Sequence, residues 1–145
     1  MKIFIDNNLP QTLVKALHTL IAPDHECVHL RDKFSENVSD LEWIEVLTKE
    51  GGWVILSQDK FTKSNKMERK ALAKSGLVVY LLSGKGWAKL KSLKKNLAIL
   101  EWTESLLDHA EPALKDAKSK GIGSAWSICY KANNRKYNIK SESLN

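Results

Sequence analysis

Four short apolar segments alternate with stretches of helical periodicity over the first 82 residues, and this alternation limits the possible folds most strongly. The apolar segments occupy residues 2–6, 25–30, 53–57 and 77–82. The last of them, LVVYLL, is apolar at every position, which predicts a strand covered on both faces. Strands of this kind alternating with helices predict a three-layer α/β fold around a central, mostly parallel sheet of about four strands.

Each connection between these strands carries signals for a helix. Asn8 offers an N-cap and Pro10 suits the first turn of a helix over residues 10–21. Ser39 and Glu42 match the capping-box pattern at the start of a second helix, which we expect to end at the glycines 51 and 52. A third helix is predicted over about residues 66–75.

The pattern changes after residue 84. Residues 87–109 have leucines at helical spacing, and a shorter helix is predicted around residues 111–119. The segment SAWSICYK-ANNR-KYNIK then indicates a β-hairpin with an asparagine-rich turn. We therefore expect one domain over residues 1–145, with an α/β core in 1–85 and a basic helical and hairpin extension in 86–145.

The net charge of +6 is carried entirely by this extension. Residues 1–84 contain 11 basic and 11 acidic side chains, whereas residues 85–145 contain 12 basic and 6 acidic ones. A basic region beside a neutral one suits a polyanionic partner, because lysine and arginine release counterions from a phosphate backbone. A solvated lysine-rich surface explains the same composition.

Acidic residues stand where parallel strands end and where the following helices begin. They are Asp6, Asp59, Asp40, Glu42 and Glu68. In an open parallel sheet these positions share the edge at which ligands bind, so the acids are expected to converge there. Crowded carboxylates repel unless a cation neutralises them, and Mg²⁺ or Mn²⁺ takes such oxygen ligands. A cation of this kind can activate water and stabilise the charge on a phosphodiester under attack.

A purely structural role is open for each of these acids. Asp6 and Asp59 suit turns at strand ends, and Asp40 suits the positive end of a helix dipole. Glu42 completes the capping box, and Glu68 stands in a similar capping position.

Several motifs together resemble a PIN-like domain. They are FIDNNLP, HECVHLRDKF, SDLEWI, GGWVILSQDKF, ERKAL and GLVVYLL, within residues 1–85. More narrowly, they resemble the VapC-type toxins of bacterial toxin–antitoxin pairs. The resemblance implies a Mg²⁺- or Mn²⁺-dependent endoribonuclease that leaves 5′-phosphate and 3′-hydroxyl ends, and an antitoxin as protein partner.

The resemblance also implies the site residues. Asp6, Asp40, Asp59 and Glu68 match the catalytic acids, with Asp6, Asp59, Asp40 and Glu42 as metal ligands. Lys60 and Thr62 stand where many family members have further acids, which leaves the ligand set open. A catalytically silent module that binds RNA or protein is the alternative function.

Basic and amide side chains extend the predicted site. Asn7, Lys60 and Arg69 are candidates for contact with RNA, and Ser57 for assisting a water at the metal. In the hairpin, Lys131, Arg135 and Lys136 alternate with Trp126, Tyr130 and Tyr137. Aromatic residues among basic ones bind single-stranded RNA in some proteins, and pack on one face of a hairpin in others.

Other features indicate a cytoplasmic protein. Cys27 and Cys129 lack metal-ligand spacing and are expected to be reduced thiols. No apolar run approaches the ~20 residues that cross a bilayer, so no membrane association is expected. The four histidines lack metal-ligand spacing and are expected to be structural. The long helix is a candidate surface for a homodimer or an antitoxin.

Overall fold

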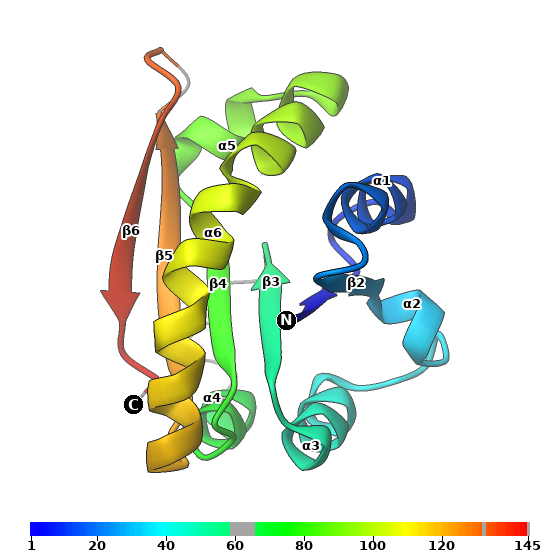
Figure 1. The fold of residues 1–145 in the computed structure, drawn as a ribbon, viewed down its shortest axis with the longest axis vertical. Helices are drawn as coiled ribbons and strands as arrows, with labels where there is room; N and C mark the ends of the chain where they lie inside the picture. The colour runs from blue at the N-terminus through cyan, green and yellow to red at the C-terminus, as the bar shows by residue number, and fades with distance from the viewer. Residues whose placement is uncertain (59–65, 132, 145) are drawn as a thin grey trace.

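A single sheet organises the molecule in the computed structural model, which describes residues 1–58, 66–131 and 133–144. Its strand order is β2-β1-β3-β4-β5-β6, in which β1 to β5 run parallel and β6 runs antiparallel to β5 (Figure 1). The strands are β1 (Lys2–Ile5), β2 (Glu26–His29), β3 (Trp53–Ser57), β4 (Val78–Ser83), β5 (Ser124–Lys131) and β6 (Lys136–Glu142). The predicted α/β fold with a mostly parallel sheet and a C-terminal hairpin is confirmed.

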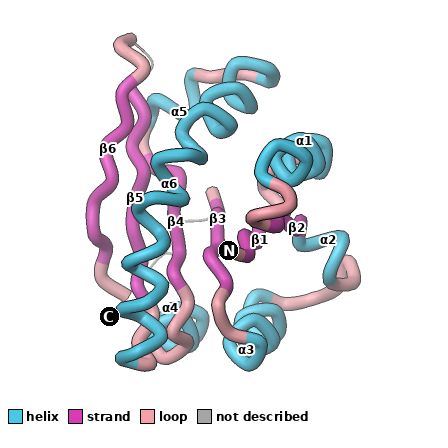
Figure 2. Tube along the Cα trace, in the orientation of Figure 1, coloured by secondary structure: helices cyan, strands magenta, loops and turns pink. Residues whose placement is uncertain are grey.

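Helices cover both faces of the sheet, as Figure 2 shows. They are α1 (Gln11–Ile21), α2 (Leu30–Lys33), α3 (Asp40–Glu50), α4 (Lys66–Ala73), α5 (Lys85–Lys89) and α6 (Ser92–Lys120). Apolar residues of α1 and α6 pack on one face, and those of α3 and α4 pack on the other. No helix in the described part of the chain is both long and apolar enough to cross a membrane.

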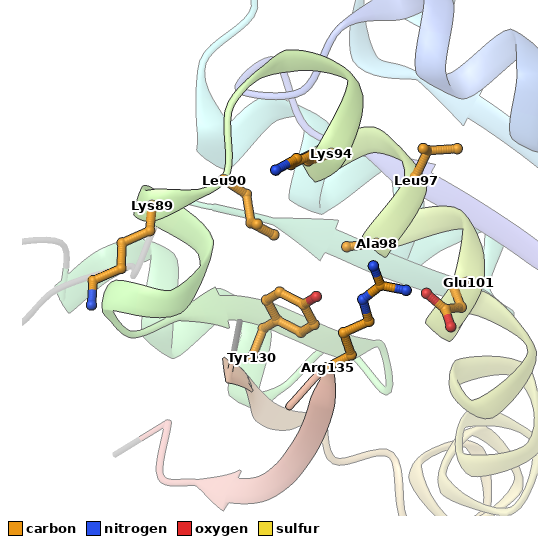
Figure 3. Close-up of a pocket in the computed structure, with 8 residues that line it drawn as sticks. All are labelled: Lys89, Leu90, Lys94, Leu97, Ala98, Glu101, Tyr130 and Arg135. Carbon is orange, nitrogen blue, oxygen red and sulfur yellow. The ribbon is translucent and has the colours of Figure 1, made fainter. Parts of the chain in front are cut away.

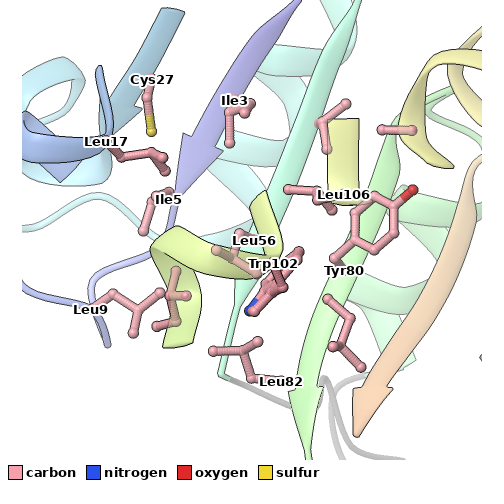
Figure 4. Close-up of a cluster of buried hydrophobic side chains, with 14 of the residues drawn as sticks. Ile3, Ile5, Leu9, Leu17, Cys27, Leu56, Tyr80, Leu82, Trp102 and Leu106 are labelled. Carbon is pink, nitrogen blue, oxygen red and sulfur yellow. The ribbon is translucent and has the colours of Figure 1, made fainter. Parts of the chain in front are cut away.

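The alternation of side chains along each strand divides the core into two clusters. Ile3 and Ile5 face α1 and α6, while Phe4 between them faces α3. Trp102 of α6 lies over the first face together with Tyr80 and neighbouring aliphatic side chains (Figure 4). Phe4, Ile3 and Ile5 are fully buried, so β1 is a central strand covered on both sides.

The sheet has six strands where the sequence predicts about four. The predicted hairpin forms, but β5 also pairs in parallel with β4. The helix α6 connects the two strands by returning the chain from the carboxyl end of β4 to its amino end. Sequence reasoning missed this pairing because register between distant segments is set by tertiary packing, which the alternating pattern of one strand does not reveal.

The helical predictions need three corrections. Asn8 does not cap α1, because the helix begins only at Gln11, with Pro10 in the N-cap position and no side-chain cap. The short helix α2 follows β2 directly, at a position where no helix was predicted. The helices expected on either side of residue 110 are one continuous helix that contains Pro112.

Packing explains why α6 tolerates Pro112. A proline inside a helix costs about 3 kcal/mol because it removes one backbone hydrogen bond and crowds the preceding turn. Leu106, Ala110 and Ala117 are buried on one face of α6, before and after the proline. Continuous burial of this face compensates the local cost. The helical stretch after β4 is interrupted between α5 and α6, and not at Pro112.

Candidate functional site

Asp6 stands at the carboxyl end of β1, between β2 and β3. Its backbone N–H donates to the carbonyl of Leu56 at 3.1 Å, which extends the pairing with β3 by one residue. Its carbonyl then accepts from the N–H of Leu9 at 3.3 Å, which turns the chain toward α1. The carboxylate is therefore set at the ligand-binding edge of the sheet, with 7% of the residue exposed.

Neutral donors hold both oxygens of this carboxylate. Oδ1 accepts from the backbone N–H of Asn7 at 2.6 Å, and Oδ2 accepts from the hydroxyl of Ser57 at 2.8 Å. Ser57 ends β3 and is fully buried. Burying a carboxylate is costly, and these donors fix its orientation without adding positive charge.

A second layer of contacts fixes the loop after Asp6. His29, which is 1% exposed, accepts at Nδ1 from the N–H of Arg31 at 3.1 Å. The proton is then on Nε2, which donates to the carbonyl of Leu9 at 2.7 Å. The Nε of Arg31 also donates to Oδ1 of Asn7 at 2.7 Å. An arginine cation therefore lies beside the residue that follows Asp6.

Two of the other predicted acids, Asp40 and Glu42, have hydrogen bonds at the start of their own helix. Asp40 begins α3, and its Oδ1 accepts from the indole N–H of Trp43 at 2.9 Å. Glu42 forms the predicted capping box with Ser39, accepting from its N–H at 2.7 Å. Glu68 lies in the first turn of α4. Asp59 lies outside the described residues.

Of the five acids in the predicted cluster, the structure describes Asp6, Asp40, Glu42 and Glu68. Over residues 1–58, 66–131 and 133–144, no three histidine, cysteine or acidic side chains are grouped so that they could hold a metal. Asp6 and Ser57 supply a carboxylate and a hydroxyl oxygen, the hard donor types that Mg²⁺ and Mn²⁺ prefer. These donors fit such a cation in type, and further ligands would have to come from other acids.

The residues predicted to contact RNA differ in their surroundings. Arg69 on α4 donates to the backbone carbonyl of Ser143, so its guanidinium contacts the C-terminal segment. Lys60 lies outside the described residues. The hairpin residues Lys131, Arg135 and Lys136 are all exposed.

The hairpin aromatics pack against the body of the protein. Tyr130 is 5% exposed, and the hydroxyl of Tyr137 donates to the carbonyl of Ala98 at 3.0 Å. Burial raises the pKa of Tyr137 to about 12. Trp126 meets the ring of His109 edge-on, with the ring centres 4.6 Å apart. The packing interpretation of these residues is therefore the one that their contacts support.

Two residues at this edge were missed by sequence reasoning. Arg31 is the second residue after β2, and its position close to the end of a strand was the available signal. Gln58 follows β3, and its Nε2 is buried without a hydrogen-bond partner among the residues that the structure describes. A buried donor without a partner is unusual in a folded protein.

Comparison with models of protein families gives a match over residues 1–84, to the model described as PIN like domain. The match covers the first four strands and the helices between them. Searches of curated proteins and of solved structures found no match.

Proposed function

Because the chain belongs to the family of PIN-like domains, we propose that it is a metal-dependent endoribonuclease that hydrolyses phosphodiester bonds of RNA. The buried carboxylate of Asp6 carries this proposal. It stands at the ligand-binding edge, oriented by Ser57 and by the backbone of Asn7. A structural turn residue would not require burial of its charge against a second strand.

The residues of the site have separate roles in this proposal. Asp6 would hold Mg²⁺ or Mn²⁺, with Asp40, Asp59, Glu42 and Glu68 as candidates for the remaining ligands. When bound, the cation would lower the pKa of an attacking water and offset the charge that develops on the phosphodiester. Ser57 orients the carboxylate of Asp6 through its hydrogen bond.

Arg31 supplies a positive charge beside Asn7, the residue that follows Asp6. Its guanidinium is held by Asn7 and its backbone by His29. From this position it would neutralise a phosphate of the RNA backbone, with two parallel donors available to the phosphate oxygens. Arg31 is therefore a positioning residue for the substrate in this proposal.

We further propose that the nuclease is the toxin of a toxin–antitoxin pair in the cytoplasm, where an antitoxin restrains it. The antitoxin would place a basic side chain or a peptide segment at the acidic edge, or bind along α6, which is also the candidate surface for a homodimer. Co-purification from the source cell tests the pair: a stably bound partner that suppresses cleavage supports it, and an active, unaccompanied protein contradicts it.

The nuclease activity is tested by cleavage of a mixed pool of structured RNA with Mg²⁺, Mn²⁺ or EDTA. Asp6→Asn is compared with Asp24→Asn, which makes the same change at an exposed position outside the site. We expect metal-dependent cleavage by the wild type and Asp24→Asn, and a loss of at least about 100-fold in Asp6→Asn. Cleavage that survives both EDTA and Asp6→Asn would contradict the proposal.

A silent PIN-like module is the second candidate function. The observation that favours it is the lack of a three-ligand group among the described residues. It predicts that the wild-type protein binds RNA but does not cut it with either metal in the cleavage assay. Circular dichroism of all three proteins establishes that differences in cleavage do not reflect unfolding.

A further inference from the structure

A cavity of about 460 Å³ lies between α5, the start of α6 and the end of the hairpin (Figure 3). Cavities of roughly 300–1,000 Å³ are typical of small-ligand sites. Its walls include Leu90, Leu97 and Ala98, and its rim carries charged residues from three elements. The family match ends at residue 84, before the first of these wall residues.

Positive charge predominates around the cavity. Lys89 ends α5, Lys94 lies in the first turns of α6, and Arg135 precedes β6, while Glu101 is the one acidic residue of the lining. All three basic residues are exposed, and none of them forms an ion pair with the described part of the chain. The lining therefore has a net charge of +2, which no ion pair within the described residues neutralises.

The backbone of the turn places Arg135 at this rim. Its φ is 53°, a left-handed conformation that is uncommon for residues other than glycine. The turn is stabilised by Asn134, whose N–H donates to the carbonyl of Lys131 at 3.4 Å. The side-chain oxygen of Asn134 also accepts from the N–H of Lys136 at 3.2 Å. Arg135 is thus presented to the cavity by a defined turn.

Tyr130 forms the floor and determines which part of a ligand can bind. Its ring packs against Trp87 and Tyr137, with ring centres 5.0 and 5.1 Å away. Because only 5% of the residue is exposed, its ring face is not available for stacking a base. The hydroxyl points into the cavity (Figure 3) and is a hydrogen-bond donor among the cations. Cations with a hydroxyl donor favour a phosphate group over a base.

The cavity shares the edge of the sheet that carries Asp6. It follows the carboxyl ends of β4 and β5, and Asp6 follows the carboxyl end of the parallel strand β1. Three strand spacings separate β1 from β5, which is about 14 Å. By the alternation of side chains along β1, Asp6 falls on the face that α3 and α4 cover, whereas the cavity opens beside α6. One strand of RNA would therefore cross this edge to reach both.

We propose that this cavity binds a backbone phosphate of single-stranded RNA and thereby sets the position of the strand relative to Asp6. The inference rests on the proposed function, since it deepens the description of how the same substrate is held. Lys94 and Arg135 contact the phosphate, Tyr130 donates a hydrogen bond to it, and Leu90 and Leu97 contact the adjoining ribose. Because no base is contacted, binding is independent of sequence at this position.

Binding is measured separately from cleavage. Fluorescence anisotropy with a labelled single-stranded RNA of about 12 nucleotides, a length within the usual site size, is recorded in EDTA. The variants are Lys94→Gln and Arg135→Asn, the latter because asparagine tolerates a positive φ. Lys118→Gln is the matched control, because Lys118 is an exposed lysine on the same helix about 36 Å from Lys94. Lys94→Arg retains the charge.

We expect Lys94→Gln and Arg135→Asn each to weaken binding about 3- to 10-fold and to reduce the dependence on salt by about 0.7 in log–log slope. Lys94→Arg and Lys118→Gln should bind like the wild type. Equal RNA affinity for all variants would overturn the proposal that the cavity binds a phosphate, and it would leave the nuclease proposal unaffected. Binding of poly-aspartate but not RNA would overturn it in favour of an acidic peptide.

Failure of the nuclease has a different signature. If the wild type does not cleave RNA with Mg²⁺ or Mn²⁺, yet Lys94→Gln and Arg135→Asn selectively weaken RNA binding, the phosphate site is supported and the catalytic proposal is overturned. If the wild type cleaves RNA and the same two variants bind it normally, the catalytic proposal is supported and the phosphate site is overturned.

Discussion

The carboxyl ends of β1 and β3 bury polar groups, whereas those of β4 and β5 are covered by aromatic rings. At the first pair of strands, Asp6 and Ser57 are buried and hydrogen-bonded to each other. At the second pair, Trp87, Tyr130 and Tyr137 pack together, with ring centres 5.0 to 6.3 Å apart. One end of the same sheet edge therefore carries buried charge, and the other carries charge only on its surface.

The difference indicates a division of roles. Burial of Asp6 costs free energy that an apolar residue would not, so its position is explained better by chemistry than by stability. The aromatic cluster stabilises the fold and supports the exposed cations of the hairpin. Substitutions at the aromatic end should change mainly stability, and substitutions at the polar end should change mainly activity.

The largest effect on stability is expected for Trp102→Ala. Trp102 is 1% exposed and contacts the aromatic cluster, so we expect a loss of about 3–5 kcal/mol in the free energy of unfolding. Its indole N–H has no hydrogen-bond partner within the described structure, so Trp102→Phe loses no hydrogen bond and should cost less than Trp102→Ala. Denaturant unfolding measures both. If Trp102→Ala lowers the free energy of unfolding by less than about 1 kcal/mol, the aromatic cluster does not stabilise the fold as assigned.

Ser57→Ala should reduce cleavage strongly and change stability little. Loss of the hydroxyl leaves Oδ2 of Asp6 without this donor, and we expect cleavage to fall about 10- to 100-fold. The free energy of unfolding should change by about 1 kcal/mol. Ser127→Ala is the matched control, because Ser127 is a buried serine on β5. Equal cleavage rates for the two variants would contradict the role of Ser57.

A smaller effect is expected from His109. Burial lowers the pKa of this imidazole, whose Nδ1 is 2.6 Å from the hydroxyl of Tyr80. The unfolded chain therefore binds a proton more readily, and stability should fall as pH drops below the ordinary histidine pKa of about 6.5. In His109→Gln this part of the pH dependence should disappear, as measured by unfolding between pH 7.5 and about pH 5. An unchanged pH profile would exclude His109 as its origin.

The two thiols provide the smallest test. Burial raises the pKa of Cys27 to about 12, so very little thiolate forms at neutral pH. Iodoacetamide should modify the partly exposed Cys129 in the native protein and Cys27 only after unfolding. Mass spectrometry of native and denatured samples, with Cys129→Ser as control, measures this difference. Rapid native modification of Cys27 would show that β2 opens more readily than its packing indicates.

Much of the fold could be predicted because local patterns and tertiary packing agree. The strand at residues 53–57 and the capping box of Ser39 and Glu42 were identified from sequence and are present. The continuity of α6 through Pro112 and the pairing of β5 with β4 were not predicted. Both depend on contacts between segments distant in sequence, which local propensity does not specify.

Less of the candidate site could be derived from sequence. The position of Asp6 at the edge of the sheet follows from the order of strands and helices, as predicted. Its hydrogen bond to Ser57 depends on the register between β1 and β3, and the contact of Arg31 with Asn7 depends on the turn after β2. Side-chain contacts of Asp40 and Glu42 could not be separated from metal binding by sequence alone, because the same residue types serve both purposes.

The most direct test of the account is calorimetric titration of Mn²⁺ into the wild type, Asp6→Asn and Asp24→Asn without RNA. We predict that the wild type and Asp24→Asn bind the cation alike. In Asp6→Asn the affinity should fall by at least about 10-fold, because one negatively charged ligand is lost. Binding of equal affinity in all three proteins would contradict the assignment of Asp6 to the functional site.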